Sequence, residues 1–407
     1  TQDELNAKRK KARDEKRAYR YDRAALELSK EAVDQKLKDG QPYVIRFKVP
    51  DEDKIYVPVD KITEVTQNIL KASGVSEEGA KNSTSVLIGN DLRGVETHGV
   101  SNGLRLYVEN YASGNYNSKP NIKIVRESAT TANIDGDGGL GAEIGPIAME
   151  MAIEKAEKYG MGAVVVSNTG HLAGCGYYPL QAVEKDMIGQ AMTSGGAGLT
   201  VPTWGSEPIL GTNPVAWAAP TKEMPPFLFD IATTQIASNK IGLARRTGAK
   251  LLPGWITDKN GDPILDEVEA PERHGRHGES NYHLLPFGGT RENGSHKGFG
   301  LGMVVEIMTN ELSGMGPAPL LKHEGSDFFA AYSIDAFTDT NKFKEDMDEL
   351  LKRIVESKPA SGYERVVYAG FLESEEYLKR SEEGIPYHKE VIEWFENHCN
   401  EIGIDCE

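Results

Sequence analysis

Gly162-Ala163-Val164-Val165-Val166-Ser167-Asn168 is the stretch that decides the fold, because five small or apolar residues in a row lead into a polar turn. Such a run is typical of a strand that is buried on both faces of a sheet. A helical pattern runs from Glu143 to Tyr159 before it, and strand patterns lie further upstream at Ile122–Val125 and Thr131–Asp135. Helices and strands that alternate in this way predict an α/β layer around a buried sheet.

Helical patterns flank this layer on both sides. Upstream, apolar residues with helical spacing begin near Ile62, and a second helix is expected from about Ser76 to Leu92. Downstream, helices are expected at Phe299–Leu312 and Phe343–Val355. We therefore expect a helical portion made of residues 57–130 and 290–407, and an α/β portion made of residues 131–289 that carries the cofactor and substrate site. Residues 1–56 form a separate extension.

The composition excludes several classes of protein. The chain has 407 residues, of which 39% are hydrophobic, and a formal net charge of −16. An acidic chain of this kind is a poor partner for nucleic acid, whose phosphates attract clustered Lys and Arg. The sequence also holds no apolar run long enough to span a membrane and no signal peptide. We expect a cytoplasmic protein whose polar partner is a small molecule.

Asp91-Leu92-Arg93-Gly94-Val95-Glu96-Thr97-His98-Gly99-Val100 places one histidine, with a hydroxyl beside it, at a glycine turn. An imidazole with an ordinary pKa of about 6.5 gives or takes a proton near neutral pH. The interconversion of a carbonyl and an alcohol requires such a proton transfer. His98 is therefore a candidate proton donor or acceptor.

A second histidine follows the buried strand directly, in Asn168-Thr169-Gly170-His171-Leu172-Ala173-Gly174. The carboxyl ends of strands in α/β sheets are where ligands commonly bind. A histidine in such a loop could also serve only to cap backbone groups. Because glycine on both sides lets a ligand approach the backbone closely, we favour a functional role for His171.

Gly136-Asp137-Gly138-Gly139-Leu140-Gly141 fits the G-x-G-x-x-G pattern of a dinucleotide-binding turn, after a strand and before a helix. The acidic residue that would hold a ribose at the end of the next strand is missing, since that strand leads into Ser167-Asn168. A turn that packs a helix tightly on the sheet explains the same glycines. We favour this structural interpretation and keep a Rossmann dehydrogenase as the alternative.

Two further motifs suit an anionic ligand. Ser295-His296-Lys297-Gly298-Phe299-Gly300 opens an apolar helix, so free N–H groups and the Lys297 charge could hold a pyrophosphate or carboxylate. A capped helix with a solvated lysine is the alternative. Asp230 follows Pro226-Phe227-Leu228-Phe229 and either caps a helix or orients a cofactor.

Metal and thiol chemistry lack their usual markers in this sequence. His274, His277 and His283 lie in or beside a charged segment that we expect to be an exposed excursion, and no carboxylate pattern accompanies them. We therefore predict no metal site. The sequence also holds no C-x-x-C motif.

The first 56 residues differ from the rest. Residues 1–40 carry twelve Lys and Arg against nine Asp and Glu, in an otherwise acidic chain. Ala18-Tyr19-Arg20-Tyr21-Asp22 and Pro42-Tyr43-Val44-Ile45-Arg46-Phe47-Lys48-Val49-Pro50 resemble a fragment of the catalytic domain of bacterial glutamyl-tRNA synthetase. The ATP-binding signatures of that enzyme are absent, so we interpret this segment as a fusion or a misassembled gene start.

From residue 57 to about 400, the motifs described above resemble in type and order those of the malate/L-lactate dehydrogenase family. This family also contains ureidoglycolate and sulfolactate dehydrogenases, diketogulonate reductase and piperideine-carboxylate reductase. The resemblance implies a non-Rossmann α/β fold in which a helical portion and a separate sheet portion build the cofactor site, usually in a homodimer. It also implies reversible oxidation of a 2-hydroxy acid with NAD or NADP.

Carried over motif by motif, the resemblance implies a role for individual residues. His98 corresponds to a proposed proton donor, with Thr97 where serine is usual, and His171 corresponds to a second histidine that acts as acid or base in some members. The family usually has an arginine where this chain has Asn102, so Arg105, about one helical turn further on, is the substitute that would bind the substrate carboxylate. The implied nucleotide contacts are Ser194, Asp230, Ile231, Ala232, His296 and Lys297.

The leading hypothesis is thus an oxidoreductase that transfers a hydride between NAD or NADP and a small 2-hydroxy or 2-oxo acid such as malate or lactate. The alternative is a catalytically altered binding protein, in which the synthetase-like segment recruits tRNA and changes such as Asn102 have removed the activity. The acidic net charge argues against this alternative.

Overall fold

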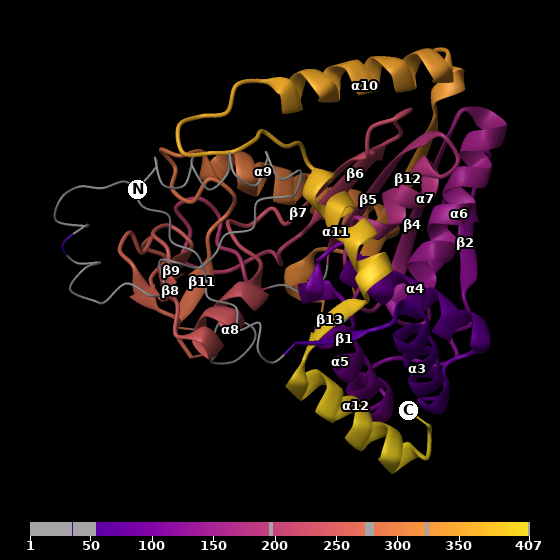
Figure 1. The fold of residues 1–407 in the computed structure, drawn as a ribbon, viewed down its shortest axis with the longest axis horizontal. Helices are drawn as coiled ribbons and strands as arrows, with labels where there is room; N and C mark the ends of the chain where they lie inside the picture. The colour runs from indigo at the N-terminus through magenta and orange to yellow at the C-terminus, as the bar shows by residue number, and fades with distance from the viewer. Residues whose placement is uncertain (1–34, 36–53, 195–197, 273–280, 322–324, 406–407) are drawn as a thin grey trace, which may run out of the picture. The chain divides into compact units, whose positions relative to one another are not determined.

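The computed structural model describes residues 35, 54–194, 198–272, 281–321 and 325–405 (Figure 1). The chain divides into two compact units, of which one comprises Thr1–Asp51 with Lys358–Val366 and the other Glu52–Ser357 with Val367–Glu407. The elements below belong to the second unit, and the synthetase-like extension lies almost entirely outside the described residues. Within the described residues, no helix is both long and apolar enough to cross a membrane.

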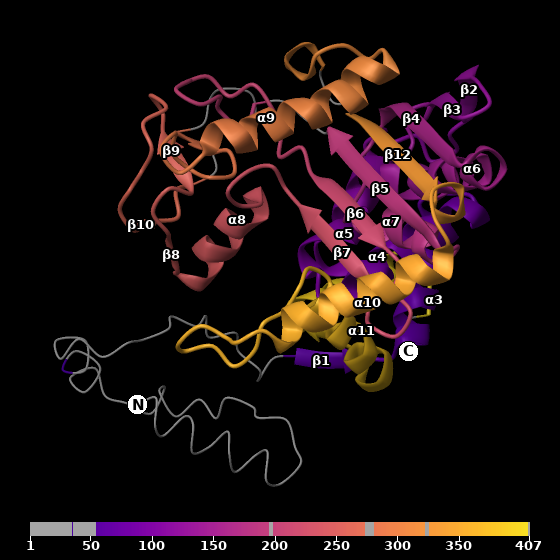
Figure 2. The same ribbon diagram turned by 90° about the horizontal axis from the view of Figure 1, so that it is seen from above.

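A seven-stranded sheet forms the centre of the second unit, in the order β2-β3-β4-β12-β5-β6-β7 (Figure 2). Only the β3–β4 pair is parallel, and the other neighbours are antiparallel. The predicted strands at Ile122–Val125, Thr131–Asp135 and Gly162–Val166 are confirmed as β2, β3 and β4. The seven strands are β2 (Lys123–Glu127), β3 (Thr131–Asp135), β4 (Met161–Thr169), β5 (Met187–Ser194), β6 (Val215–Ala219), β7 (Phe227–Ile231) and β12 (Gly325–Ser333).

Alternating side chains of β4 and β12 fill the core on both faces of this sheet. Val164 and Val166 of β4 belong to the same apolar cluster as Phe329 of β12, whereas Val165 and Phe328 belong to a cluster on the opposite face. Successive residues of a strand point to opposite faces, so an unbroken apolar run is required where both faces are covered.

Helices cover both faces of the sheet. On one face α6 (Gly141–Tyr159) and α7 (Tyr177–Val183) pack on β4, β12 and β5. On the other face lies α9 (Ser295–Glu306), which continues as one turn of π-helix, η3 (Ile307–Glu311). The predicted helices at Glu143–Tyr159 and Phe299–Leu312 are confirmed by α6 and by α9 with η3.

A helical group packs on the outer side of α6 and includes the two termini of this unit. Its helices surround a short antiparallel sheet of β1 and β13, so the start and the end of the dehydrogenase-like sequence are hydrogen-bonded together. The elements are β1 (Lys54–Val57), α3 (Val59–Ala72), α4 (Glu77–Leu92), the 3-10 turn η2 (Glu96–His98), α5 (Val100–Ala112), α11 (Phe371–Glu383), β13 (Ile385–His388) and α12 (Lys389–Ile402).

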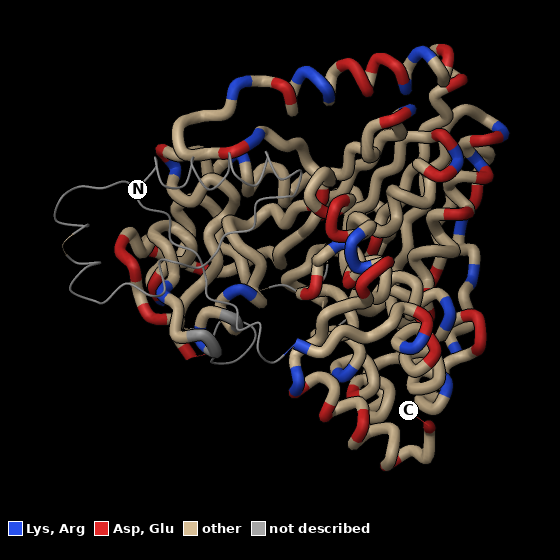
Figure 3. Tube along the Cα trace, in the orientation of Figure 1, with Lys and Arg blue, Asp and Glu red and all other residues tan. Residues whose placement is uncertain are grey.

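The remaining elements form a small lobe and an outer helix. The lobe has its own apolar cluster and consists of α8 (Ser238–Thr247), β8 (Lys250–Leu251), β9 (Ile256–Asp258), β10 (Val268–Glu269) and β11 (Tyr282–Leu284). The 3-10 turns η4 (Ala318–Leu320) and η5 (Ile334–Ala336) flank β12, and η5 leads towards α10 (Thr340–Glu356). Charges of both signs follow one another along α10 (Figure 3), which is typical of a solvated helix face.

The boundaries that we predicted for the helical portion and the α/β portion do not match the strands that form the sheet. Its strands β2 and β12 come from residues 57–130 and 290–407, the ranges that we assigned to the helical portion, rather than from residues 131–289. The sheet is also mostly antiparallel. β12 lies between β4 and β5 and pairs with both, so a strand remote in sequence completes the layer.

Candidate functional site

His98 lies at the end of the short turn η2, between α4 and α5. Gly94 opens the segment with a φ of +77°, which residues with a side chain rarely adopt, so glycine is required there. Thr97 Oγ1 and His98 Nδ1 are 2.9 Å apart, within hydrogen-bond distance. The hydroxyl that the sequence places beside His98 therefore holds its Nδ1.

His171 follows β4, and a tyrosine holds its ring. The hydroxyl of Tyr107, on α5, lies 2.8 Å from His171 Nδ1. The backbone of His171 is fixed as well. Its carbonyl accepts a hydrogen bond from the N–H of Ala142, and its N–H donates to the hydroxyl of Tyr116. Tyr107 is fully buried, so its hydroxyl has few alternative partners.

The structure brings the two histidines together. The ring centroids of His98 and His171 are 5.8 Å apart and the ring planes are inclined by 22°, so the imidazoles are stacked. A hydroxyl engages Nδ1 of each ring. The Nε2 atoms are thereby left as the nitrogens with which a ligand can exchange a proton.

Both imidazoles are held in their neutral form near neutral pH. Burial lowers the pKa of His98, and burial together with the nearby charge of His98 lowers the pKa of His171 to about 4. The His171 residue is nonetheless exposed to solvent. A small ligand can therefore reach this ring, and its lowered pKa makes it a candidate functional group.

The glycine run Gly136–Gly141 packs against the end of β4 and the loop that carries His171. The N–H groups of Gly136 and Gly138 donate to the carbonyls of Ser167 and Asn168, and a Cβ on Gly141 would lie 2.6 Å from the carbonyl oxygen of Gly170. These backbone donors are used inside the protein and so are not offered to a pyrophosphate. The structure thus supports the packing interpretation over the Rossmann alternative.

Asp230, near the end of β7, is joined to the His171 loop. Its Oδ2 accepts a hydrogen bond of 2.6 Å from the N–H of Gly176, the residue that precedes α7. Burial raises the pKa of this carboxyl to about 6, although the side chain keeps accessible surface. Asp230 therefore anchors the residue before α7, but it lies within β7 and does not occupy the N-cap position that one of its two predicted roles required.

The other loops predicted to contact the nucleotide converge beyond β7, where Ile231 and Ala232 are partly exposed. The N–H of Thr233 donates to the carbonyl of Thr212, and the N–H of Phe287 donates to the carbonyl of Thr233. The amide of Asn213 donates to the carbonyl of Gly302 on α9. Three segments that are distant in sequence thus meet beside α9.

His296 and Lys297 lie in the first turn of α9, and both side chains are exposed. The next residue must be glycine, because a Cβ on Gly298 would lie 2.1 Å from the carbonyl oxygen of Phe287. The N–H groups of Ser295 and Lys297 donate to the carbonyls of Thr290 and Gly294, so it is the positive end of this twelve-residue helix and the Lys297 side chain that favour a phosphate or a pyrophosphate. These residues therefore fit the anionic part of a dinucleotide.

Ser194 is placed differently from the expectation. Its side chain is only 1% exposed, and its hydroxyl donates to Glu306 Oε2 at 2.6 Å while it accepts from the amide of Asn310 at 2.8 Å. The physical reason is the buried carboxylate of Glu306, which requires donors. The Ser194 hydroxyl thus ties β5 to α9 instead of facing a nucleotide.

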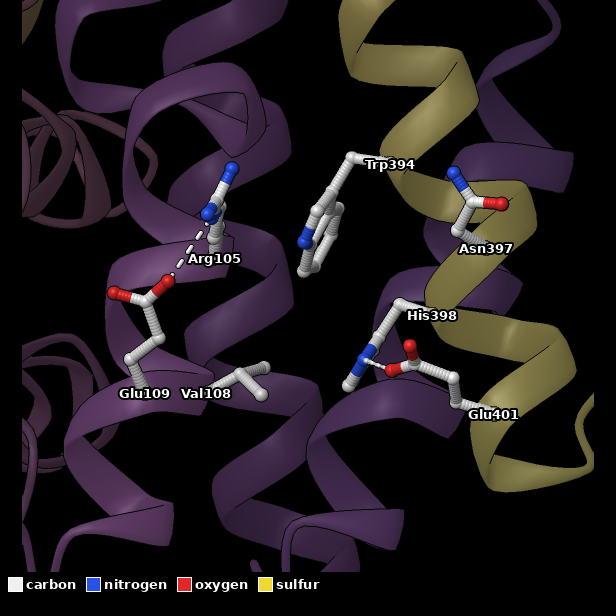
Figure 4. A pocket seen from close by; sticks show the side chains of 7 residues that line it. All are labelled: Arg105, Val108, Glu109, Trp394, Asn397, His398 and Glu401. Atoms are coloured by element: carbon white, nitrogen blue, oxygen red, sulfur yellow. Dashed lines mark hydrogen bonds and ion pairs between the residues drawn. The ribbon is translucent and has the colours of Figure 1, made fainter.

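Arg105 is not brought to the histidines by any contact among the described residues. It lies on α5 about two helical turns beyond His98, its side chain is 66% exposed, and its Nε pairs with Glu109 at 2.9 Å. It lines a pocket of about 330 Å³ between α5 and α12, together with Trp394 and His398 (Figure 4). Asn102 stays near the His98 turn, where its amide donates to the carbonyl of Glu96.

Within the described residues, no group of three or more His, Cys, Asp or Glu side chains could hold a metal ion. His283 is buried in β11, and burial lowers its pKa. His274 and His277 lie outside the described residues.

Sequence reasoning missed the tyrosines of this site. Tyr107 and Tyr111 are four residues apart on one buried face of α5, so their spacing predicts core packing and nothing more. Tyr116 lies beyond the end of that helix and reaches back to His171. Their role depends on how α5 crosses the end of β4, which local patterns do not encode.

Fold and site together define a non-Rossmann α/β dehydrogenase architecture, as comparison with known proteins shows. The family model described as malate/L-lactate dehydrogenase matches residues 57–396, and the chain belongs to this family. A second family model, the catalytic domain of class I tRNA synthetases for Glu and Gln, matches residues 1–71, which confirms the resemblance of the N-terminal segment.

The matches to individual relatives cover nearly the whole length of each relative. The malate dehydrogenase of Pyrococcus abyssi is 39% identical over 364 residues, which are 87% of this chain and 97% of the relative. The L-sulfolactate dehydrogenase of Methanocaldococcus jannaschii is 37% identical and covers 84% of this chain and 95% of its own. The crystal structure of malate dehydrogenase from Entamoeba histolytica superposes with a TM-score of 0.82 at 33% identity, covering 86% of this chain and 99% of that one.

Proposed function

We propose that this protein is a dehydrogenase that uses NAD or NADP to interconvert a small 2-hydroxy acid and the corresponding 2-oxo acid. The observation that carries the proposal is the stacked pair of His98 and His171, each with Nδ1 held by a hydroxyl. Membership of the malate/L-lactate dehydrogenase family supports it, as do relatives named for malate and sulfolactate. We therefore propose malate and sulfolactate as the first substrates to test.

The two imidazoles suit proton transfer in both directions. Because burial keeps them neutral, an Nε2 without a proton can accept the proton of a substrate hydroxyl during oxidation. An anionic substrate beside the rings raises their pKa, since a nearby negative charge favours the protonated imidazole. The bound acid therefore makes the same groups better proton donors for reduction.

We propose that the cofactor lies along the segment from Asp230 to the first turn of α9. There the side chains of Lys297 and His296, at the positive end of the helix, would hold its phosphates. The hydrogen bond from the N–H of Gly176 to Asp230 joins this segment to the glycine-rich loop that follows His171. When bound, the nicotinamide supplies or takes up the hydride.

An absorbance assay at the nicotinamide band tests this proposal. The purified protein is mixed with malate, sulfolactate, lactate or ureidoglycolate, each with NAD and with NADP. We expect turnover with malate or sulfolactate above a control that contains cofactor without acid. An absence of turnover with every acid and both cofactors would overturn the proposed function.

We further propose that the protein is a homodimer, and that α9 contributes to the contact between the copies. Four apolar side chains on or directly after α9 and η3 are each between 38% and 54% exposed, namely Met303, Val304, Ile307 and Leu312. Exposed apolar side chains that gather along one stretch of helix favour an interaction site. The homodimers that are usual in the family make a second copy the expected partner.

The Ile307→Glu variant is expected to have the mass of a single chain by light scattering, because a charge in an apolar interface is costly. Leu378→Glu on α11 is the matched control, since Leu378 is 65% exposed on another element and should leave the mass of a dimer unchanged. A wild-type protein of single-chain mass, or a dimeric Ile307→Glu variant, contradicts the proposal.

A further inference from the structure

A buried carboxylate lies directly behind the turn that carries His98. Asp91, near the end of α4, is 0% exposed. Its Oδ2 accepts a hydrogen bond of 2.9 Å from the N–H of Val100 and one of 2.7 Å from the hydroxyl of Tyr387. Val100 begins α5, and the residue before it, Gly99, has no side chain to cap the helix. Asp91 therefore does the capping from a distance.

The fit between this carboxylate and the turn leaves no free space. A Cβ on Gly99 would lie 1.8 Å from Asp91 Oδ1, so that only glycine allows the close approach. Asn90, the neighbour of Asp91, donates its side-chain amide to the carbonyl of His98 at 3.2 Å. Two consecutive residues of α4 thus hold the backbone of His98 and of the residues that follow it.

The C-terminal part of the chain holds Asp91 in turn. Tyr387 is 1% exposed and lies on β13, the strand paired with β1. Arg380 of α11 donates to the main-chain carbonyl of Asp91 at 2.7 Å and to Glu96 Oε1 at 2.8 Å. Burial raises the pKa of Asp91 to about 7, and the carboxyl faces Tyr387, Arg380 and Glu96. Arg380 and Tyr387, almost three hundred positions after Asp91, therefore brace the His98 turn from two sides.

We propose that Tyr387 is a positioning residue for His98, and that it acts through the Asp91 carboxylate to keep the His98 ring stacked on His171. The role in turnover rests on the proposed function, whereas the placement of the ring does not. Tyr387 does not contact the substrate. The Tyr387 hydroxyl holds Asp91 Oδ2, the oxygen that caps α5 at Val100. This cap in turn holds the turn that carries His98, two residues before Val100.

The Tyr387→Phe variant tests this proposal, since it removes one oxygen atom and keeps the buried ring. We expect kcat to fall roughly ten- to a hundredfold, as displacement of a reacting group by about 1 Å can do, with KM for acid and cofactor changed less than about threefold. Tyr368→Phe is the matched control, because Tyr368 is also buried and its hydroxyl donates to the carbonyl of Pro225, without contact to the His98 turn. Both variants should lose similar thermal stability.

A readout without turnover separates this inference from the proposed function. The imidazole NMR titration of His98 in Tyr387→Phe should move towards the ordinary pKa of about 6.5, because a displaced ring is better solvated. Asp91→Asn, which keeps the shape of the neutral acid, should preserve the wild-type His98 titration and most of the activity, whereas Asp91→Ala should not. If Tyr387→Phe leaves the His98 titration unchanged, or if Tyr368→Phe changes it equally, the positioning role is wrong, whatever the activity of the wild-type protein.

Discussion

Replacing His98 by alanine is expected to lower kcat by about 10²- to 10⁴-fold, the usual contribution of a positioned general acid or base. The substitution removes one of the two stacked rings, and with it the Nε2 to which we assign the proton transfer. Affinity for the cofactor should stay close to that of the wild type, because the phosphates are assigned to the first turn of α9. Steady-state kinetics together with cofactor titration by fluorescence separates the two effects.

Controls for this prediction use the other groups around the rings. His398→Ala removes an imidazole that stacks on Trp394 in the pocket between α5 and α12, and it should leave turnover unchanged. Thr97→Ala keeps the His98 ring and removes its Nδ1 partner, so a smaller loss, on the order of tenfold, is expected. Wild-type kcat in His98→Ala would mean that this ring takes no part in proton transfer.

The two histidines could be predicted from the sequence because local signals mark both of them. His171 follows an apolar strand and has glycine nearby, and His98 lies in a glycine turn beside a hydroxyl. Their stacking could not be predicted in detail, because it depends on Tyr107 and on the Asp91 brace, which join α5, α4 and β13. Contacts between elements so distant in sequence leave no periodic pattern.

The sheet shows the same limit. β4 is an uninterrupted apolar run and could be predicted, whereas β12 was not, although it pairs with β4 along almost its whole length. Its sequence, Gly325-Ser326-Asp327-Phe328-Phe329-Ala330-Ala331-Tyr332-Ser333, begins with polar residues that are nonetheless buried. Ser326 is buried because its hydroxyl bonds the side chain of Asn310 on η3, a tertiary contact that outweighs local propensity.

Polar residues were also the least predictable part of the site. Ser194 was expected to face a nucleotide, but the structure uses its hydroxyl for the buried Glu306. Arg105 was expected to reach the substrate, but its place on α5 turns it towards α12. In both cases the residue type fits the predicted chemistry, and the direction of the side chain is set by neighbours that the sequence pattern does not reveal.

The Phe329→Ala variant is expected to lose about 3–5 kcal/mol of unfolding free energy, the usual cost of truncating a fully buried phenylalanine. Phe329 is 0% exposed at the centre of β12, lies opposite Val164 of β4, and meets the ring of Tyr178 edge to face at 5.2 Å. Its removal leaves a cavity between the central strands and α7, which neighbours in a paired sheet cannot collapse to fill.

Phe337→Ala provides the matched control, since the same truncation at a side chain that is 73% exposed should change stability by less than about 0.5 kcal/mol. Urea unfolding followed by circular dichroism measures both variants against the wild type. Equal and small losses would mean that β12 is not the central strand of the folded core. A large loss confined to Phe329→Ala would support the placement of this late strand between β4 and β5, because only there is its ring covered on every side.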